Sequence, residues 1–233
     1  MKLFEIISTP QPKSISGERA YSSSSNFLPI RAAFNKSELK GKVDKLGGGA
    51  FADVYQHKNR PGMVMKVGVI GHGRDGYYAF LNHIFRNQRM QSNPYLPRVY
   101  NIKTYQVKPN RVEYVIELER LDTLMSTDAE GIQNMGHRLF KDYDSLKAAY
   151  LGGLPKEYVD EVEERDAFTA LISHVMKKQL SITHVQDKKF REACAIVGNI
   201  AKKTGHIVDM HSGNAMIRRT SVGPQLVITD PLV

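Results

Sequence analysis

The apolar pattern changes near the middle of the chain, and this change limits the folds that its 233 residues can form. In the first half, short apolar runs bounded by turn residues predict four strands, at residues 50–57, 63–69, 98–106 and 111–118. Between the second and third runs, apolar side chains spaced three or four residues apart predict a helix over residues 76–91. The order strand, strand, helix, strand, strand predicts a small antiparallel sheet with one helix packed on it.

The second half is predicted to be mainly helical, with helices over residues 128–150, 155–180 and 187–204. The last of these has the clearest apolar stripe and is followed by Gly205, a typical C-cap residue. Residues 206–233 return to short extended segments around a loop. Together the two halves predict an α+β fold.

Composition excludes several classes of protein. No apolar run approaches the roughly 18–20 residues of a membrane span, so no membrane partner is expected. The N-terminus carries Glu5, Pro10 and Pro12 where a secretory signal needs an unbroken apolar segment, which favours a cytoplasmic location. Cys194 is the single cysteine, so the chain has no internal disulfide and no cysteine cluster for zinc.

The charge balance points to negatively charged partners. Lys and Arg total 33 against 24 Asp and Glu, a formal net charge of +9 at pH 7. This surplus favours nucleotide phosphates, an acidic protein surface or nucleic acid. Because the positive charge is dispersed and no nucleic-acid-binding motif accompanies it, nucleic acid is the secondary candidate.

A glycine run precedes the first predicted strand, where Gly47, Gly48 and Gly49 lead into Ala50 and Phe51. Glycine lets the backbone approach a ligand closely, and successive N–H groups can then point at phosphate oxygens. Taken alone, such a run is more typical of a turn than of a phosphate site. The sequence has no G-x-x-x-x-G-K-[ST], so a phosphate site here is not a P-loop.

Lys66 strengthens the phosphate interpretation, because it lies between Met65 and Val67 on a strand that is otherwise apolar. Burying an ammonium group without a partner is costly, and an anionic ligand supplies a partner. The alternative is an edge strand from which the lysine side chain reaches water.

A second group of polar residues follows the last predicted helix. Asp209 and Asn214 are separated by five positions, and Asp230 follows a short apolar segment. Phosphoryl transfer needs a carboxylate that orients the attacking hydroxyl and oxygen ligands for Mg²⁺, and these three residues supply both. Each piece alone is also typical of an Asx-type turn.

In this order, the motifs resemble those of the protein-kinase-like fold. The pattern G-x-G-x-x-G-x-V is present as Gly47, Gly49, Ala52 and Val54, with Ala in the third glycine position. The strand lysine is Lys66, the spacing D-x-x-x-x-N is Asp209 to Asn214, and Asp230 stands where D-F-G begins, followed by Pro231. The sequences around Asp209 and Asp230 further resemble the early serine/threonine protein kinases of T-odd and related podophages.

The resemblance implies a role for each matching residue. Asp209 would orient or deprotonate the substrate Ser/Thr hydroxyl, and Lys66 would contact the α- and β-phosphates of ATP. Asn214 and Asp230 would hold Mg²⁺. The other implied ATP contacts are the loop residues Gly47, Gly48, Gly49, Ala50, Phe51 and Ala52, the adenine walls Val54, Ile116 and Leu118, and the hinge backbone at Glu117, Leu118 and Glu119.

Three departures from the family pattern affect these roles. The sequence has no Glu between Lys66 and Glu113, so the helix Glu that usually pairs with the lysine is missing. Either Asp75 would substitute for it from the helix N-terminus, or the nucleotide alone would hold Lys66. Residues 207–208 contain no arginine that could bind a phosphate on an activation loop. His211 stands where protein kinases commonly have Lys and aminoglycoside phosphotransferases have His, and it would contact the γ-phosphate or cap the loop.

The resemblance also implies a bilobal organisation. Residues 1–34 are rich in Ser and are expected to form a flexible N-terminal arm with candidate autophosphorylation sites. Residues 35–120 would form the N-lobe with the Gly-rich loop, and residues 121–233 a mainly helical C-lobe truncated after the metal-binding Asp230. Without an activation segment, we expect an enzyme that is always active.

The function expected from the resemblance is an ATP- and Mg²⁺-dependent serine/threonine protein kinase in the host bacterial cytoplasm. Its expected partners are host bacterial proteins of the transcription and RNA-processing machinery. Two alternatives remain open: a pseudokinase-like binder of an acidic host protein, and a small-molecule phosphotransferase.

Overall fold

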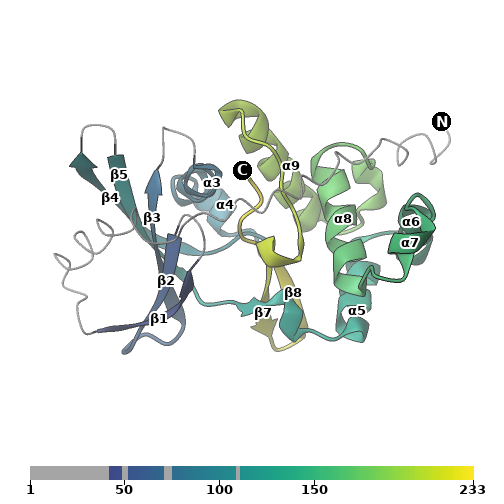
Figure 1. Cartoon of the computed structure of the whole chain (residues 1–233), viewed down its shortest axis with the longest axis horizontal. Helices are drawn as coiled ribbons and strands as arrows, with labels where there is room; N and C mark the ends of the chain where they lie inside the picture. The colour runs from purple at the N-terminus through teal and green to yellow at the C-terminus, as the bar shows by residue number, and fades with distance from the viewer. Residues whose placement is uncertain (1–41, 49–51, 71–74, 109–110) are drawn as a thin grey trace.

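The structure, a computed structural model of the chain, describes residues 42–48, 52–70, 75–108 and 111–233 (Figure 1). The described residues form an α+β fold with a five-stranded antiparallel sheet at one end and a group of helices at the other. A smaller three-stranded sheet lies between them. The serine-rich arm predicted at residues 1–34 lies outside the described residues.

The five-stranded sheet confirms the four strands predicted from the apolar runs. The sheet also contains one further strand, β1. The sequence did not indicate this strand, because the segment carries few apolar side chains. Its Leu46 is half exposed at the sheet edge. The strand order is β1-β2-β3-β5-β4, and all neighbours are antiparallel. The strands are β1 (Val43–Gly48), β2 (Ala52–His57), β3 (Met63–Ile70), β4 (Val99–Lys108) and β5 (Arg111–Glu119).

The helix predicted over residues 76–91 is wrong in its length, because the chain forms α3 (Gly76–Phe85) and then the short α4 (Gln88–Gln91). Asn87 separates them: its backbone is extended, and its side chain accepts hydrogen bonds from the N–H groups of Arg89 and Met90. Apolar spacing alone does not reveal such a local cap.

The second half of the chain contains the small sheet and most of the helices. The sheet has the order β6-β7-β8, again with antiparallel neighbours. Its strands are β6 (Asp122–Thr123), β7 (Ala215–Thr220) and β8 (Gly223–Ile228). The helices are α5 (Ala129–Leu139), α6 (Tyr143–Gly152), α7 (Lys156–Val159), α8 (Glu164–Met176) and α9 (Lys188–Thr204), with one-turn 3₁₀ helices η1 (Leu124–Ser126), η2 (Ile182–His184) and η3 (Ser212–Asn214).

Two of the three helices predicted here are wrong in their extent, because each is divided into two. The first breaks between α5 and α6, where Phe140 is extended and pairs with Val185, and where Asp142 has a left-handed φ of 54°. The second breaks between α7 and α8, where Glu163 is extended. The helix predicted over residues 187–204 is confirmed as α9, which Asp187 caps and Gly205 ends with a φ of 74°.

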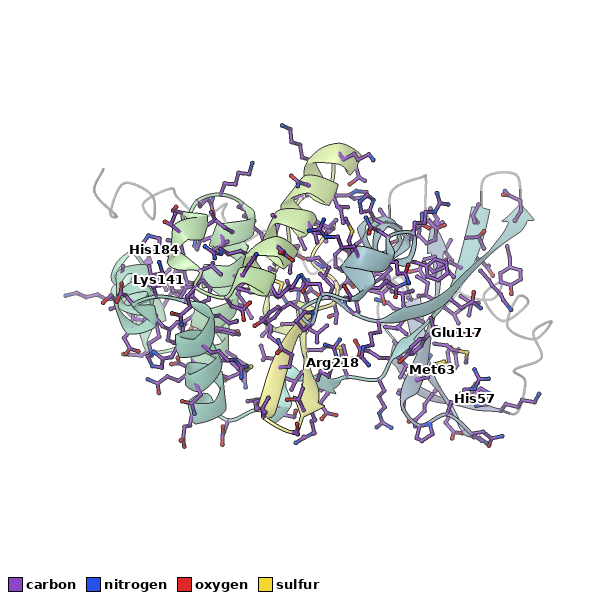
Figure 2. The ribbon with its side chains drawn as sticks, turned by 180° about the vertical axis from the view of Figure 1, so that it is seen from behind. His57, Met63, Glu117, Lys141, His184 and Arg218 are labelled. Atoms are coloured by element: carbon purple, nitrogen blue, oxygen red, sulfur yellow. The ribbon has the colours of Figure 1, made fainter. Side chains whose placement is uncertain are left out.

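One continuous apolar core joins the two ends of the molecule. It includes Phe80 of α3, Ile116 of β5, Phe168 of α8 and Ile228 of β8. Arg218 lies between the end that carries Met63 and Glu117 and the end that carries Lys141 and His184 (Figure 2). Within the described part of the chain, no helix combines the length and the apolar character needed to cross a bilayer.

Candidate active site

Lys66 lies at the centre of the large sheet, in the strand β3. It stands opposite Val54 of β2 and Ile116 of β5 in the strand register, so the three side chains share one face. Its ammonium nitrogen lies 3.2 Å from Oδ2 of Asp230, 164 residues further along the chain. The side chains of Lys66 and Asp230 are 21% and 33% exposed, so the structure brings these two predicted site residues together in a partly buried pair.

A second contact of Lys66 was not predicted from the sequence. The ammonium nitrogen lies 3.3 Å from the centroid of the Tyr77 ring, at the start of α3. Asp75, which the sequence offers as a substitute for the missing helix Glu, caps α3 instead by accepting the Tyr78 N–H at 2.9 Å. Tyr77 gave no signal of this role because it also fits the apolar face of a helix.

The loop at Asp209 and the segment at Asp230 are held together by main-chain hydrogen bonds. The Asp209 N–H donates to the Pro231 carbonyl at 2.9 Å, and residues 208 and 232 form a β-bridge. The N–H groups of Thr229 and Asp230 both donate to the Asn214 carbonyl, at 3.1 and 3.4 Å. The backbone therefore fixes Asp209, Asn214 and Asp230 as neighbours.

The hairpin β7–β8 explains why these residues meet. Ala215 pairs with Ile228 at its open end, so the residues just outside, Asn214 and Thr229, lie side by side. The Asn214 side chain is also fixed, because its Nδ2 donates to the Asp209 carbonyl at 2.6 Å. With the amide nitrogen bound in this way, Oδ1 is the atom of Asn214 that is left for a cation.

His211 lies at the start of η3. Its Nδ1 accepts the Gly213 N–H at 3.1 Å, so the ring caps the loop, as one of the two predicted roles requires. Its Nε2 lies 3.9 Å from Oδ2 of Asp209, and both side chains are about half exposed. The His211 ring therefore also stands beside the predicted catalytic carboxylate.

The electrostatic environment disfavours a bare carboxylate at Asp230. Burial raises the pKa of the Asp230 carboxyl, and the nearby Asp75 and Asp209 carboxylates raise it further, although Lys66 acts in the opposite direction. A cation placed between these acidic groups would relieve this cost.

The site could contribute only part of a magnesium coordination shell. Among the residues that the structure describes, no group of three or more His, Cys, Asp or Glu is arranged to hold a metal ion. Mg²⁺ is commonly bound by one or two carboxylates together with phosphate oxygens and waters. One carboxylate from Asp230 and one amide oxygen from Asn214 fit that pattern.

The predicted glycine-rich loop is described only in part. Gly47 and Gly48 end β1, opposite Val54 and Asp53 of β2, and a Cβ atom on Gly47 would meet no atom within 4 Å. Ala52 begins β2 and is buried. Gly49, Ala50 and Phe51 lie outside the described residues, so their predicted contact with phosphates stays a prediction.

The predicted adenine walls and hinge lie along β5 and beside it. Ile116 and Leu118 are buried in the core, and Val54 packs against it from β2. Glu117 pairs with Met65 and lies within the sheet. Both the main chain and the side chain of Glu119 are hydrogen-bonded. Its N–H donates to the Arg98 carbonyl at 3.1 Å, and its carboxylate accepts hydrogen bonds from Arg218. The binding of adenine by this segment stays a prediction.

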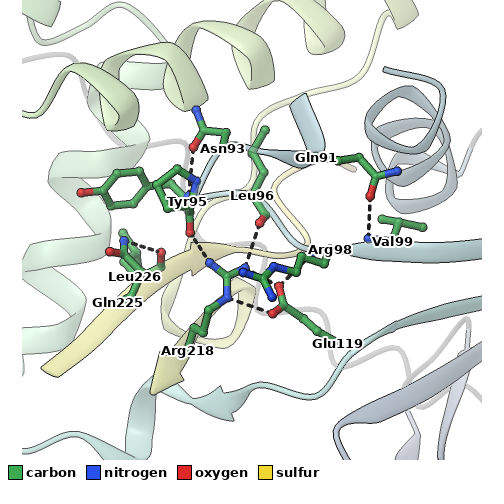
Figure 3. A network of polar contacts seen from close by, with 11 residues as sticks. Gln91, Asn93, Tyr95, Leu96, Arg98, Val99, Glu119, Arg218, Gln225 and Leu226 are labelled. Carbon is green, nitrogen blue, oxygen red and sulfur yellow. Dashed lines mark hydrogen bonds and ion pairs between the residues drawn. The ribbon is translucent and has the colours of Figure 1, made fainter. Parts of the chain in front are cut away.

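Arg218 and Glu119 form an ion pair that sequence analysis did not find (Figure 3). Arg218 Nε donates to Glu119 Oε2 at 2.8 Å, and the same guanidinium donates to the carbonyls of Pro94 at 2.6 Å and Leu96 at 3.2 Å. The pair joins β7 of the small sheet to the end of β5. Because 99 residues separate the partners, no local pattern reveals it.

Comparison with known proteins adds no assignment. No protein-family model matches the chain, and a search of curated proteins returns no match.

Proposed function

We propose that the chain is an ATP- and Mg²⁺-dependent serine/threonine protein kinase with a bilobal, protein-kinase-like fold. The observation that carries this proposal is the 3.2 Å pair between Lys66 and Asp230, beside an Asp209–Asn214 loop that the backbone ties to Asp230. A strand lysine, a loop Asp and Asn five positions apart, and a second Asp are the polar groups that phosphoryl transfer by protein kinases requires.

The fold supports the same assignment. The large sheet with α3 packed on it would be the N-lobe, and the helices with the β6–β8 sheet would be the C-lobe. Lys66 belongs to the first part, whereas Asp209, Asn214 and Asp230 belong to the second. A nucleotide at the junction would contact both.

In this proposal, each of the site residues would have its own role in the transfer reaction. The Asp209 carboxylate would accept the proton of the substrate Ser or Thr hydroxyl and orient its oxygen for attack. The Lys66 ammonium would bind phosphate oxygens, and His211 would keep the loop in shape through its bond to the Gly213 N–H. Magnesium, held by Asp230 and by Oδ1 of Asn214, would supply positive charge against the phosphates.

The proposed substrates are proteins, and the expected ones are host bacterial proteins of the transcription and RNA-processing machinery. The formal net charge of +9 favours acceptors with acidic surfaces. The proposed location is the bacterial cytoplasm, where ATP and these proteins are present.

The test is transfer of the γ-phosphate from labelled ATP, with the protein alone and in a bacterial lysate. We expect label on Ser or Thr of protein acceptors, and roughly a 100- to 10,000-fold lower rate for Asp209→Asn because the proton acceptor is lost. Asp160→Asn is the matched control, since Asp160 is an exposed carboxylate at the end of α7. Equal transfer by Asp209→Asn, or transfer to small acceptors alone, would overturn the proposal.

A further inference from the structure

Lys66 has to keep its position when its carboxylate partner is engaged elsewhere. In the proposed function, on which this inference rests, the Asp230 carboxylate that lies 3.2 Å from the ammonium group would serve as a magnesium ligand and would no longer be available to Lys66 alone. Among the described residues, the Tyr77 ring is the other group in close contact with the ammonium nitrogen.

We propose that Tyr77 is the positioning residue of Lys66, and that the face of its ring holds the ammonium group for the phosphates in place of a helix carboxylate. The Lys66 nitrogen lies 3.3 Å from the ring centroid, well inside the roughly 6 Å range of cation–π attraction. Tyr77 as a whole is 8% exposed, so little water competes for the contact.

The ring is a suitable holder because it is neutral. Burial raises the pKa of the Tyr77 phenol, and the Asp230 and Asp75 carboxylates raise it further, so the hydroxyl stays protonated near neutral pH. A neutral ring leaves the full positive charge of Lys66 for the phosphate oxygens. Unlike a carboxylate, it also does not compete with Asp230 for a metal ion.

The position of the ring is fixed by its helix. Asp75 caps α3, and Gly76 lies so close to the segment after Asp230 that a Cβ atom there would be 2.6 Å from the Leu232 carbonyl carbon. The start of α3 is thereby packed against the same segment that carries Asp230. This packing places the Tyr77 ring over Lys66.

The first experiment measures the contact itself and does not depend on the proposed function. Lysines of the full chain are reductively methylated with ¹³C, which keeps their charge, and the Lys66 methyl resonance is assigned by its loss in Lys66→Arg. We expect the ring to shift this resonance away from those of exposed lysines. The shift should persist in Tyr77→Phe and in Asp230→Asn, and disappear in Tyr77→Leu. Tyr78→Leu is the matched control, because Tyr78 is on the same helix but its ring lies tilted against that of Tyr114, with the centroids 5.5 Å apart.

The second experiment measures phosphate transfer. Tyr77→Phe should keep kcat/KM for ATP within about twofold, whereas Tyr77→Leu should lower it by roughly 3- to 30-fold. Fluorinated phenylalanines at position 77 separate attraction from packing, because added fluorine weakens the negative ring face with little change of shape. We expect kcat/KM to fall stepwise with each fluorine.

The outcomes distinguish the two proposals. Loss of the shifted resonance in Asp230→Asn, or equal rates for phenylalanine and trifluorophenylalanine at position 77, would overturn the role of Tyr77. A shifted resonance in a wild-type protein that transfers no phosphate would establish the contact and overturn the kinase function instead.

Discussion

The Asp230 carboxyl occupies an electrostatically unfavourable position. Burial raises its pKa above the ordinary value of 3.8, even with the Lys66 ammonium 3.2 Å away. Folding therefore favours the protonated form. The stability linked to this group is fully present below about pH 3.8 and is lost as the pH rises through the folded-state pKa.

We predict that Asp230→Asn stabilises the protein at neutral pH while it abolishes phosphate transfer. The neutral amide avoids the cost of a partly buried charge, so the free energy of unfolding should rise by about 0.5–1 kcal/mol, a figure reduced for partial exposure. Urea unfolding at pH 7.5 and pH 4 measures the effect, and the gain should shrink at the lower pH. A variant less stable than the wild type at pH 7.5 would show that the Lys66 pair stabilises the fold.

At the scale of elements, α3 depends on the absence of a side chain at Gly76. Alanine is the better helix former by about 1 kcal/mol, which by itself would favour the substitution. Here, however, its Cβ atom would lie 2.6 Å from the Leu232 carbonyl carbon, and backbone atoms cannot move aside as a flexible side chain can.

We predict that Gly76→Ala lowers the free energy of unfolding by about 1–3 kcal/mol and reduces phosphate transfer, because α3 must move and take Tyr77 from Lys66. Chemical denaturation and transfer assays measure the two effects. Gly62→Ala is the control, since a Cβ atom on Gly62 would meet nothing within 4 Å. If the two variants behaved alike, close packing at Gly76 would not hold the helix.

The same elements show what could be predicted from the sequence. The strands β2 to β5 were predicted because they follow from apolar runs bounded by turn residues. The helix α9 was predicted because it follows from its apolar stripe and from the C-cap residue Gly205. The breaks at Asn87 and Asp142 were not, because a side-chain cap and a single left-handed residue leave the apolar spacing intact. Lys66 and Asp230 were singled out from motif order.

Contacts between distant segments account for what the sequence could not predict at the site. Tyr77 could be assigned to an apolar helix face, but its position over Lys66 depends on how α3 packs on the sheet. The ion pair of Glu119 with Arg218 depends on the docking of β7 beside the end of β5. Such contacts are set by packing and have no local sequence pattern.

At the scale of the whole molecule, this ion pair connects the large sheet to the small one. The side chains of Arg218 and Glu119 are 15% and 8% exposed, and the carboxylate also accepts the Arg98 N–H at 2.9 Å. The neighbouring pair of Arg219 with Asp122 also joins β7 to residues after β5, but its side chains are 77% and 38% exposed. The second pair is exposed and serves as the control for the first, which is buried and has further hydrogen bonds to main-chain groups.

We predict that Glu119→Gln and Arg218→Met each lower the free energy of unfolding by about 3–5 kcal/mol, because each leaves one buried charge without its partner. The double variant should cost less than the sum of the single changes by about 1–3 kcal/mol, since it removes both charges. Asp122→Asn should change stability by no more than about 1 kcal/mol, as expected of an exposed pair. Denaturant unfolding of the four variants measures these values. Additive costs for the buried pair would show that Arg218 stabilises the junction through the carbonyls of Pro94 and Leu96 and not through Glu119.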